Sequence, residues 1–87
     1  MKLLKFHAAW CQPCKQLSTV LGQIRLPFPV VNIDIDDNMD AAIEFGIKSV
    51  PSMILLDEND NILQKITGTR SKQQLEELFQ PYLGNTE

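Results

Sequence analysis

The stretch Ala8-Ala9-Trp10-Cys11-Gln12-Pro13-Cys14-Lys15 decides the interpretation of the chain, because it places two cysteines three residues apart between a predicted strand and a predicted helix. Residues 2–7, which precede it, are short, mixed and partly aromatic, as is typical of a strand. Over residues 14–25, apolar side chains recur at helical spacing: Leu17, Val20, Leu21 and Ile24. Pro13 is compatible with the first helical turn, whereas the prolines of residues 26–29 predict the end of the helix.

The position of the two cysteines predicts that one of them is reactive. Cys11 falls at the N-terminus of the helix, where free N–H groups and the helix dipole favour a negative charge and therefore lower the pKa of a thiol. Cys11 is expected to be the more exposed sulfur, and Cys14, one turn into the helix, the more buried one. This arrangement predicts dithiol–disulfide exchange, with Cys11 as nucleophile and Cys14 as resolving thiol. No metal or organic cofactor is needed for it.

Two other uses of a Cys-x-x-Cys motif fit this sequence less well. A zinc site needs a second pair of ligands, but the chain has no further cysteine, and His7 is its only histidine. Covalent haem attachment needs a histidine directly after the second cysteine, where this chain has Lys15. The motif therefore favours redox chemistry, and no metal ligands are predicted.

The middle of the chain predicts a second strand and a second helix. Residues 30–36 alternate between apolar and polar side chains, which is strand periodicity. A short helix capped by Asp37 or Asn38 is expected to run to about Phe45. Gly46 then ends this helix, as glycine commonly does.

The last third of the chain predicts a hairpin and a final helix. Residues 52–56 and 62–67 form two strands joined by a polar turn, and Ser71–Gln74 is a capping box. The helix that follows has an apolar stripe of Leu75, Leu78, Phe79 and Tyr82. The two helical connections predict parallel pairing among the first strands, and the hairpin adds an antiparallel pair. The order β-α-β-α-β-β-α thus predicts an α/β fold, with a four-stranded mixed sheet and helices on both faces.

Length and charge exclude several classes of protein. The 87 residues suit one domain, predicted over residues 1–87, and a hydrophobic share of 44% supplies its core. The net charge is −3 and the eight Lys and Arg are scattered, so neither nucleic acid nor a membrane is an expected partner. No apolar run approaches the roughly 18 residues of a membrane span or the about 7–15 residues of a secretory leader. We therefore expect a cytoplasmic protein, in a compartment that keeps thiols reduced.

Four separated segments resemble the thioredoxin family, in that family's order and spacing. They are Ala8–Lys15, Val31–Asp36, Phe45–Ser52, and Gly68 after the last strand. The resemblance implies the thioredoxin fold and a protein-disulfide oxidoreductase, an electron carrier that reduces disulfide-containing target proteins. It also implies that an NADPH-dependent thioredoxin reductase is the partner that reduces this chain, which is expected to act as a monomer.

The resemblance further assigns a surface that binds target proteins. It implies that the Val50-Pro51 peptide bond is cis and faces the active-site sulfurs. The backbone of Val50 then pairs with an extended target segment. Trp10, Pro13, Val50, Pro51 and Gly68 are expected to line an apolar collar for such segments, although packing in the core is an alternative for Trp10.

The chain also departs from the family pattern. Typical bacterial members begin with an additional strand and helix, and their central dipeptide is Gly-Pro, where this chain has Gln12-Pro13. Lys5 stands where thioredoxins generally have a buried aspartate that helps to deprotonate the second cysteine. We expect Lys5 to pair with Asp34 or Asp36 and to stabilise thiolate by charge attraction. The alternative is that its stem crosses apolar surface to reach water.

His7 is the second unusual residue beneath the predicted site. It lies two residues after Lys5 and therefore on the same face of the strand. The family usually has an aromatic side chain at this spot. His7 is either a substitute proton acceptor or a packing replacement.

Two other functions stay open from the sequence. A glutaredoxin-like carrier would take electrons from glutathione, but Gly68-Thr69 does not match the Gly-Gly turn of that family, and Trp10 favours thioredoxin. The domain could also be an interaction module of the same fold, with incidental redox activity. An exposed apolar collar with inert cysteines would indicate such a module.

Overall fold

The computed structural model describes residues 1–82 and contains the predicted elements in the predicted order. The first three are strand β1 (Lys2–His7), helix α1 (Gln12–Leu21) and strand β2 (Val30–Asp34). They are followed by helix α2 (Met39–Glu44), strands β3 (Ser52–Leu56) and β4 (Ile62–Thr67), helix α3 (Lys72–Phe79) and a 3₁₀ turn (Gln80–Tyr82). The last five residues of the predicted domain, 83–87, lie outside the described residues.

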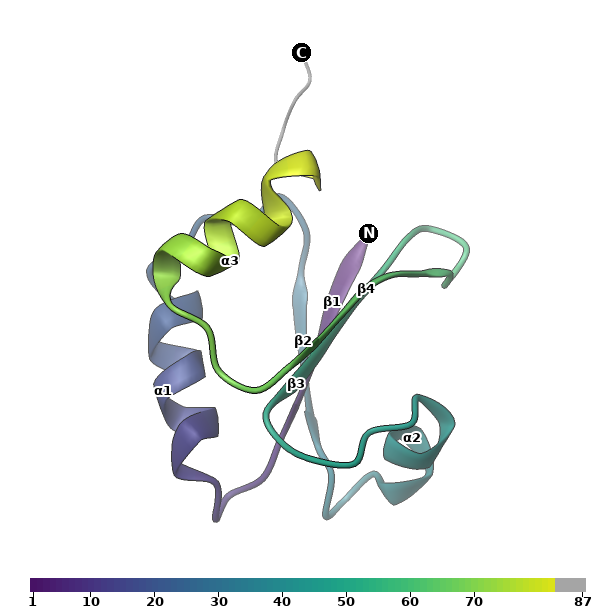
Figure 1. The fold of residues 1–87 in the computed structure, drawn as a ribbon. Helices are drawn as coiled ribbons and strands as arrows, with labels where there is room; N and C mark the ends of the chain where they lie inside the picture. The colour runs from purple at the N-terminus through teal and green to yellow at the C-terminus, as the bar shows by residue number, and fades with distance from the viewer. Residues whose placement is uncertain (83–87) are drawn as a thin grey trace.

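Within residues 1–82, four strands form one mixed sheet in the order β2-β1-β3-β4. β1 pairs in parallel with β2, which places Lys5 beside Asn32, and antiparallel with β3, which places Lys5 beside Met53. β3 and β4 form the predicted antiparallel hairpin. The prediction of parallel pairing is confirmed for β1 and β2 but is wrong for the second helical connection. The second helical connection leads instead into a strand antiparallel to β1, and β3 starts near the end where β2 stops (Figure 1).

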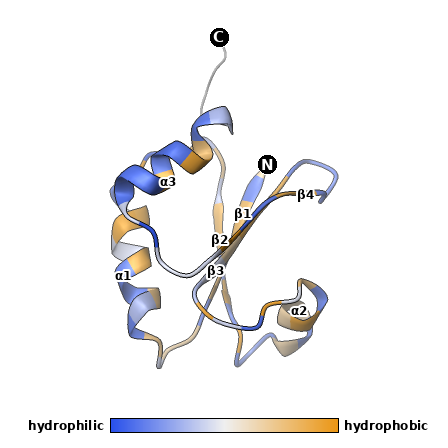
Figure 2. Ribbon diagram, in the orientation of Figure 1, coloured by the Kyte–Doolittle hydropathy of each residue, from blue (hydrophilic) through white to orange (hydrophobic). Residues whose placement is uncertain are grey.

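Alternation along β1 divides the core between the two faces of the sheet. Leu3 packs on one face with Leu17 of α1 and Phe79 of α3. Phe6 packs on the opposite face, where its ring centroid lies 5.9 Å from that of Phe45, directly after α2. Figure 1 accordingly shows α1 and α3 on one side of the sheet and α2 on the other. Figure 2 shows apolar residues concentrated in the strands between these helices, and the predicted fold class is confirmed.

The two helices near the cysteines end at glycines. α1 ends at Leu21, so the predicted extension to about residue 25 is wrong. Gly22 follows as the C-cap, and its N–H reaches the carbonyl oxygen of Ser18 at 3.0 Å. Because glycine has a low helix propensity, the helix stops well before the prolines that were expected to end it. α2 ends as predicted, with Gly46 at φ +66°, a conformation that favours glycine.

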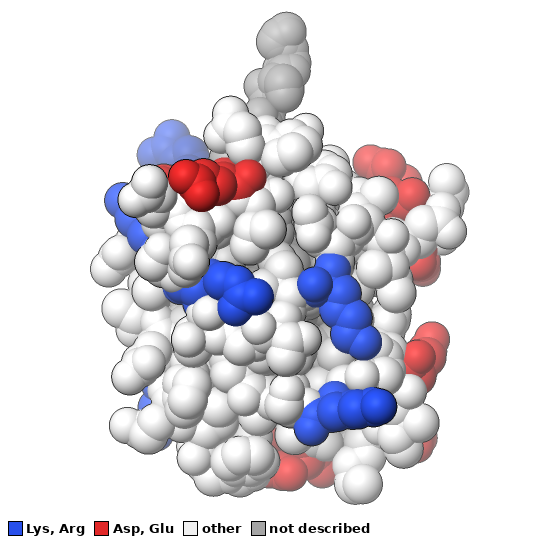
Figure 3. Space-filling model, in the orientation of Figure 1, with Lys and Arg blue, Asp and Glu red and all other residues white. Residues whose placement is uncertain are grey.

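Charged side chains are distributed over the outside of this fold. On the face shown in Figure 3, Lys and Arg lie in separate groups divided by uncharged surface, and they do not form one continuous stripe. Among the described residues, none of the helices is long and apolar enough to cross a membrane. The face in this view therefore offers no extended basic track.

The capping box at the start of α3 is confirmed. Ser71 Oγ accepts the N–H of Gln74 at 3.1 Å, and the Gln74 side chain accepts the N–H of Ser71 at 2.9 Å. We expect Ser71→Ala to lower the free energy of unfolding by about 1 kcal/mol, because the N–H of Gln74 at the helix start loses its capping acceptor. Urea unfolding of the wild type and the variant measures this change, and Ser71→Asn, which retains a capping side chain, is the matched control. Equal losses in both variants would contradict a role for the cap.

Candidate functional site

Helix α1 begins between the two cysteines, and its start holds their sulfurs together. Cys11 is the N-cap residue in extended conformation, and Pro13 lies in the first turn. The Sγ atom of Cys11 accepts the backbone N–H of Cys14 at 3.1 Å. The two residues form a disulfide, with their Cα atoms 5.3 Å apart. Cys11 Sγ therefore lies at the positive end of the helix, where a negative charge is stabilised.

The two cysteines differ less in exposure than expected. Cys11 is 4% exposed and Cys14 is 3% exposed, so in the disulfide form the two residues are both buried and their exposed fractions are nearly equal. The physical reason is that neighbours from separate segments cover both residues. Ala8 packs with them directly, and Ile35 and Val50 pack against this cluster.

The segment before β3 lies against the disulfide. The Val50-Pro51 peptide bond is cis, as the family resemblance implied, and Val50 is half-buried against the cysteines. Pro51 is buried, and its carbonyl oxygen accepts the N–H of Gly68 at 2.8 Å. Gly68 has φ +86°, a conformation that residues with a Cβ rarely adopt. Three of the predicted collar residues are thus linked to one another and, through Val50, to the cysteines.

Trp10 lies on the surface beside the cysteines. Its side chain is 68% exposed, so the alternative of a core position is wrong. The indole Nε1–H donates a hydrogen bond to Asp36 Oδ2 at 3.1 Å. Asp36 lies in the turn after β2, so this bond ties the segment around Cys11 to the β2–α2 connection. Pro13 is also exposed, next to the cysteine pair.

Lys5 does not make the ion pair that was predicted. Its ammonium group donates a hydrogen bond to Ser18 Oγ on α1, and neither Asp34 nor Asp36 lies within ion-pair distance of it. The reason is the alternation of β1, which turns Lys5 toward α1, while Asp36 is engaged by Trp10. Lys5 is only 6% exposed, so most of its side chain is covered by protein. Burial lowers the pKa of Lys5 from its ordinary value, since the charged form loses hydration.

His7 lies on the same face of β1 as Lys5, as predicted from the alternation. It is half-buried and stands beside Asp34 in the parallel pairing with β2. Its carbonyl oxygen accepts the N–H of Ile35 at 2.9 Å, which extends this pairing past the end of β2. Whether the imidazole accepts a proton or fills space stays a prediction.

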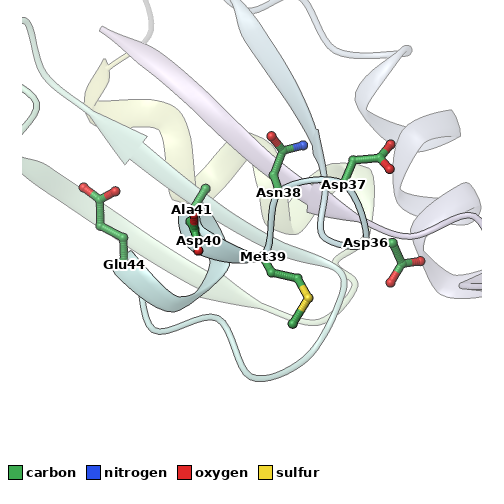
Figure 4. Close-up of a pocket in the computed structure, with 7 residues that line it drawn as sticks. All are labelled: Asp36, Asp37, Asn38, Met39, Asp40, Ala41 and Glu44. Atoms are coloured by element: carbon green, nitrogen blue, oxygen red, sulfur yellow. The ribbon is translucent and has the colours of Figure 1, made fainter.

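A hollow of about 520 Å³ opens beside α2 and includes Asp36, the partner of the indole. It is lined by Asp36, Asp37, Asn38, Met39, Asp40, Ala41 and Glu44. Figure 4 shows these side chains pointing in different directions and not toward one centre. Within residues 1–82, no three potential metal ligands come together. Among the described residues, the candidate reactive groups are therefore the two cysteines at the start of α1.

The fold and the cysteine geometry have counterparts among known proteins. A family model described as thioredoxin matches residues 1–80 of this chain. The chain belongs to the thioredoxin family. The thioredoxin of Listeria monocytogenes is 31% identical to it over 85 residues, covering 93% of this chain and 82% of that protein.

Two further thioredoxins show how much of a longer protein the chain resembles. Mitochondrial thioredoxin of Bos taurus is 30% identical over 86 residues, covering 94% of this chain and 51% of that protein. The chain thus spans about half the length of the mitochondrial relatives that it matches. The structure of a mutant thioredoxin from Halobacterium salinarum superimposes with a TM-score of 0.86 at 26% identity, covering 99% of this chain and 77% of that one.

Two residues at the candidate site of this chain were not assigned from its sequence. Ser18 is four residues after Cys14, and this spacing places both on one face of α1, but a lone serine in a helix gave no reason to choose it as the partner of Lys5. Asp36 was considered only as a partner for Lys5. No signal in the sequence indicated that its partner is the indole N–H of Trp10.

Proposed function

We propose that the chain is a thiol–disulfide oxidoreductase that reduces disulfides of target proteins through Cys11 and Cys14. The observation that carries this proposal is the hydrogen bond from the Cys14 N–H to Cys11 Sγ at 3.1 Å, at the first turn of α1. When the disulfide is reduced, the same N–H group and the helix dipole stabilise a thiolate on Cys11. The thiolate is the form that attacks disulfides.

The proposed exchange transfers two electrons in two substitutions at sulfur. The Cys11 thiolate first attacks a sulfur of the target disulfide, which forms a mixed disulfide and releases one target thiolate. The Cys14 thiolate then attacks Cys11 Sγ, which closes the Cys11–Cys14 bond and releases the second target thiolate. The target gains two electrons, and the cysteine pair loses two. The Cα separation of 5.3 Å already suits the product of this second step.

We assign target binding to the surface around the cysteine pair. Trp10 is exposed and held by Asp36, and Pro13 is exposed beside it. Val50 contacts the cysteine cluster, and its backbone is proposed to pair with an extended segment of the target. Pro51 and Gly68 complete the proposed surface, and the Pro51 carbonyl oxygen accepts the N–H of Gly68.

The proposed partners follow from this chemistry. They are proteins that contain accessible disulfides, and an NADPH-dependent thioredoxin reductase that returns the pair to the dithiol form. A cytoplasmic location suits a pair that must be reduced again after each turnover. We propose that the chain acts as a monomer without an organic cofactor.

A turnover assay with three reductants tests the function. We expect the protein to accelerate insulin reduction by dithiothreitol, and by NADPH with thioredoxin reductase, but not by glutathione with glutathione reductase. Cys11→Ser should reduce the rate to that of the reductant alone, because a hydroxyl does not replace a thiolate as the nucleophile. Activity only with glutathione would favour a glutaredoxin-like carrier. A folded protein that accelerates none of the reactions would favour an interaction module.

A further inference from the structure

The buried lysine of β1 has no counter-charge among the described residues of the oxidised protein. Lys5 is 6% exposed, and within residues 1–82 no carboxylate lies within 4.0 Å of its ammonium group. Its hydrogen-bond acceptor is the neutral hydroxyl of Ser18. Its neighbour on β3 is Met53, which is fully buried and apolar. A buried cation in such surroundings is costly unless an anion comes close.

The geometry places this cation one helical turn from Cys14. Ser18 follows Cys14 by four residues, and two residues at this spacing lie above one another on the same face of a helix. Cys14 and Leu17 of α1 are buried, whereas Ser18 is exposed. The hydrogen bond to Ser18 therefore holds the ammonium group of Lys5 against α1. Cys14 lies on the same helix and on the same side of the sheet.

We propose that Lys5 is a positioning residue for the redox reaction: held on Ser18, its ammonium group stabilises the thiolate of Cys14 and so favours the dithiol form. This inference rests on the proposed function. The disulfide carries no charge, whereas its opening creates thiolates that attract a nearby cation in a poorly hydrated site. In the resolving step, the thiol of Cys14 loses its proton to solvent, and the resulting thiolate attacks Cys11 Sγ as described above.

Few other ionisable groups face the region between β1 and α1 that holds Lys5 and Cys14. His7 is on the same face of β1, and Asp34 stands beside His7 on β2. α1 contributes the two cysteines, and the buried residues of α3 are the apolar Leu75 and Phe79. Lys15, next to Cys14 in sequence, is exposed on the outside of α1. Lys5 is therefore the buried cation among the described residues that is placed to act on Cys14.

The test is an NMR titration of the Cβ resonances of both cysteines in the reduced protein. We expect Lys5→Met to raise the pKa of Cys14 by about one unit, about a tenfold loss of thiolate at a given pH, and to change that of Cys11 less. Lys5→Arg retains the positive charge, so the pKa of Cys14 should stay within about a few tenths of a unit of the wild-type value. Lys15→Met is the matched control, because it removes an equal charge next to Cys14 but in water, where screening makes the effect small.

Two results would overturn the inference. One is a Cys14 pKa that is unchanged in folded Lys5→Met, and the other is an equal shift in Lys15→Met, which would indicate a general effect of net charge. Methionine matches the length of the lysine stem and Ser18 is exposed to water, so the variant is expected to fold; Lys5→Gln repeats the test if it does not. Both cysteines are retained, so an unchanged titration in a variant that still reduces insulin rejects the role of Lys5 and leaves the proposed function intact.

Discussion

Replacement of Cys14 by serine is expected to convert the protein from a catalyst into a covalent trap for its targets. Cys11 keeps its place at the start of α1, so it still attacks a target disulfide and forms the mixed disulfide. The serine hydroxyl cannot displace the target, because it is neither acidic enough nor nucleophilic enough at neutral pH. Insulin reduction should therefore fall to the rate of the reductant alone. The mixed disulfide should accumulate toward one target per protein.

Non-reducing gel electrophoresis and intact mass measurement after mixing with a disulfide-containing protein detect this complex. Cys11→Ser is the matched control, since it removes the other sulfur from the same pair and should trap nothing. A reducing agent should release the complex, because the link is a disulfide. Trapping by Cys11→Ser and not by Cys14→Ser would reverse the proposed roles of the two cysteines, and trapping by neither would remove the basis for exchange.

The geometry explains why the order of the two cysteines matters although their exposures are nearly equal. Cys11 lies outside the helix as its N-cap, so its Sγ can receive an N–H that the helix leaves free. Cys14 lies inside the first turn, and its own backbone N–H donates to Cys11 Sγ. The asymmetry therefore comes from hydrogen bonding and not from burial, and solvent exposure alone would not distinguish the proposed nucleophile from the proposed resolving thiol.

Local patterns in the sequence were sufficient to predict most of the fold. The bounds of β1, β3 and β4 and the capping box of α3 were correct, because strand alternation and capping depend on neighbouring residues. The direction of β3 was not predicted correctly. It depends on where the chain re-enters the sheet after α2, which is information about tertiary packing.

The site was predictable where a residue type has one dominant chemistry. The pairing of Cys11 with Cys14 was predicted from their spacing, and the cis bond before Pro51 from the family resemblance. The partner of Lys5 was wrong because acidic residues after β2 suggested an ion pair, whereas side-chain direction on β1 selected Ser18. A long flexible side chain can reach several elements, and sequence spacing does not show which of them it reaches.

The second large effect that we expect is on stability, from Phe79→Ala in α3. Phe79 is fully buried, and its ring meets that of Phe28 edge-on with centroids 5.9 Å apart. Removal of a buried phenylalanine ring costs about 3–5 kcal/mol, a large part of the roughly 5–15 kcal/mol that stabilises a domain. At about 4 °C or more per kcal/mol for a domain of this size, the melting temperature should fall by at least about 12 °C.

Thermal unfolding followed by circular dichroism measures this loss, and Ile43→Ala is the matched control. Ile43 is also a large apolar residue on a helix, but it is 73% exposed, so its truncation should change stability by no more than about 0.5 kcal/mol. Similar melting temperatures for the two variants would contradict the placement of Phe79 in the core. Phe79 contacts the cluster around Leu3 and not the cysteine cluster, so below its melting temperature Phe79→Ala should still form the Cys11–Cys14 disulfide. The chemistry at the start of α1 thus depends on α3 only through the folded state that α3 stabilises.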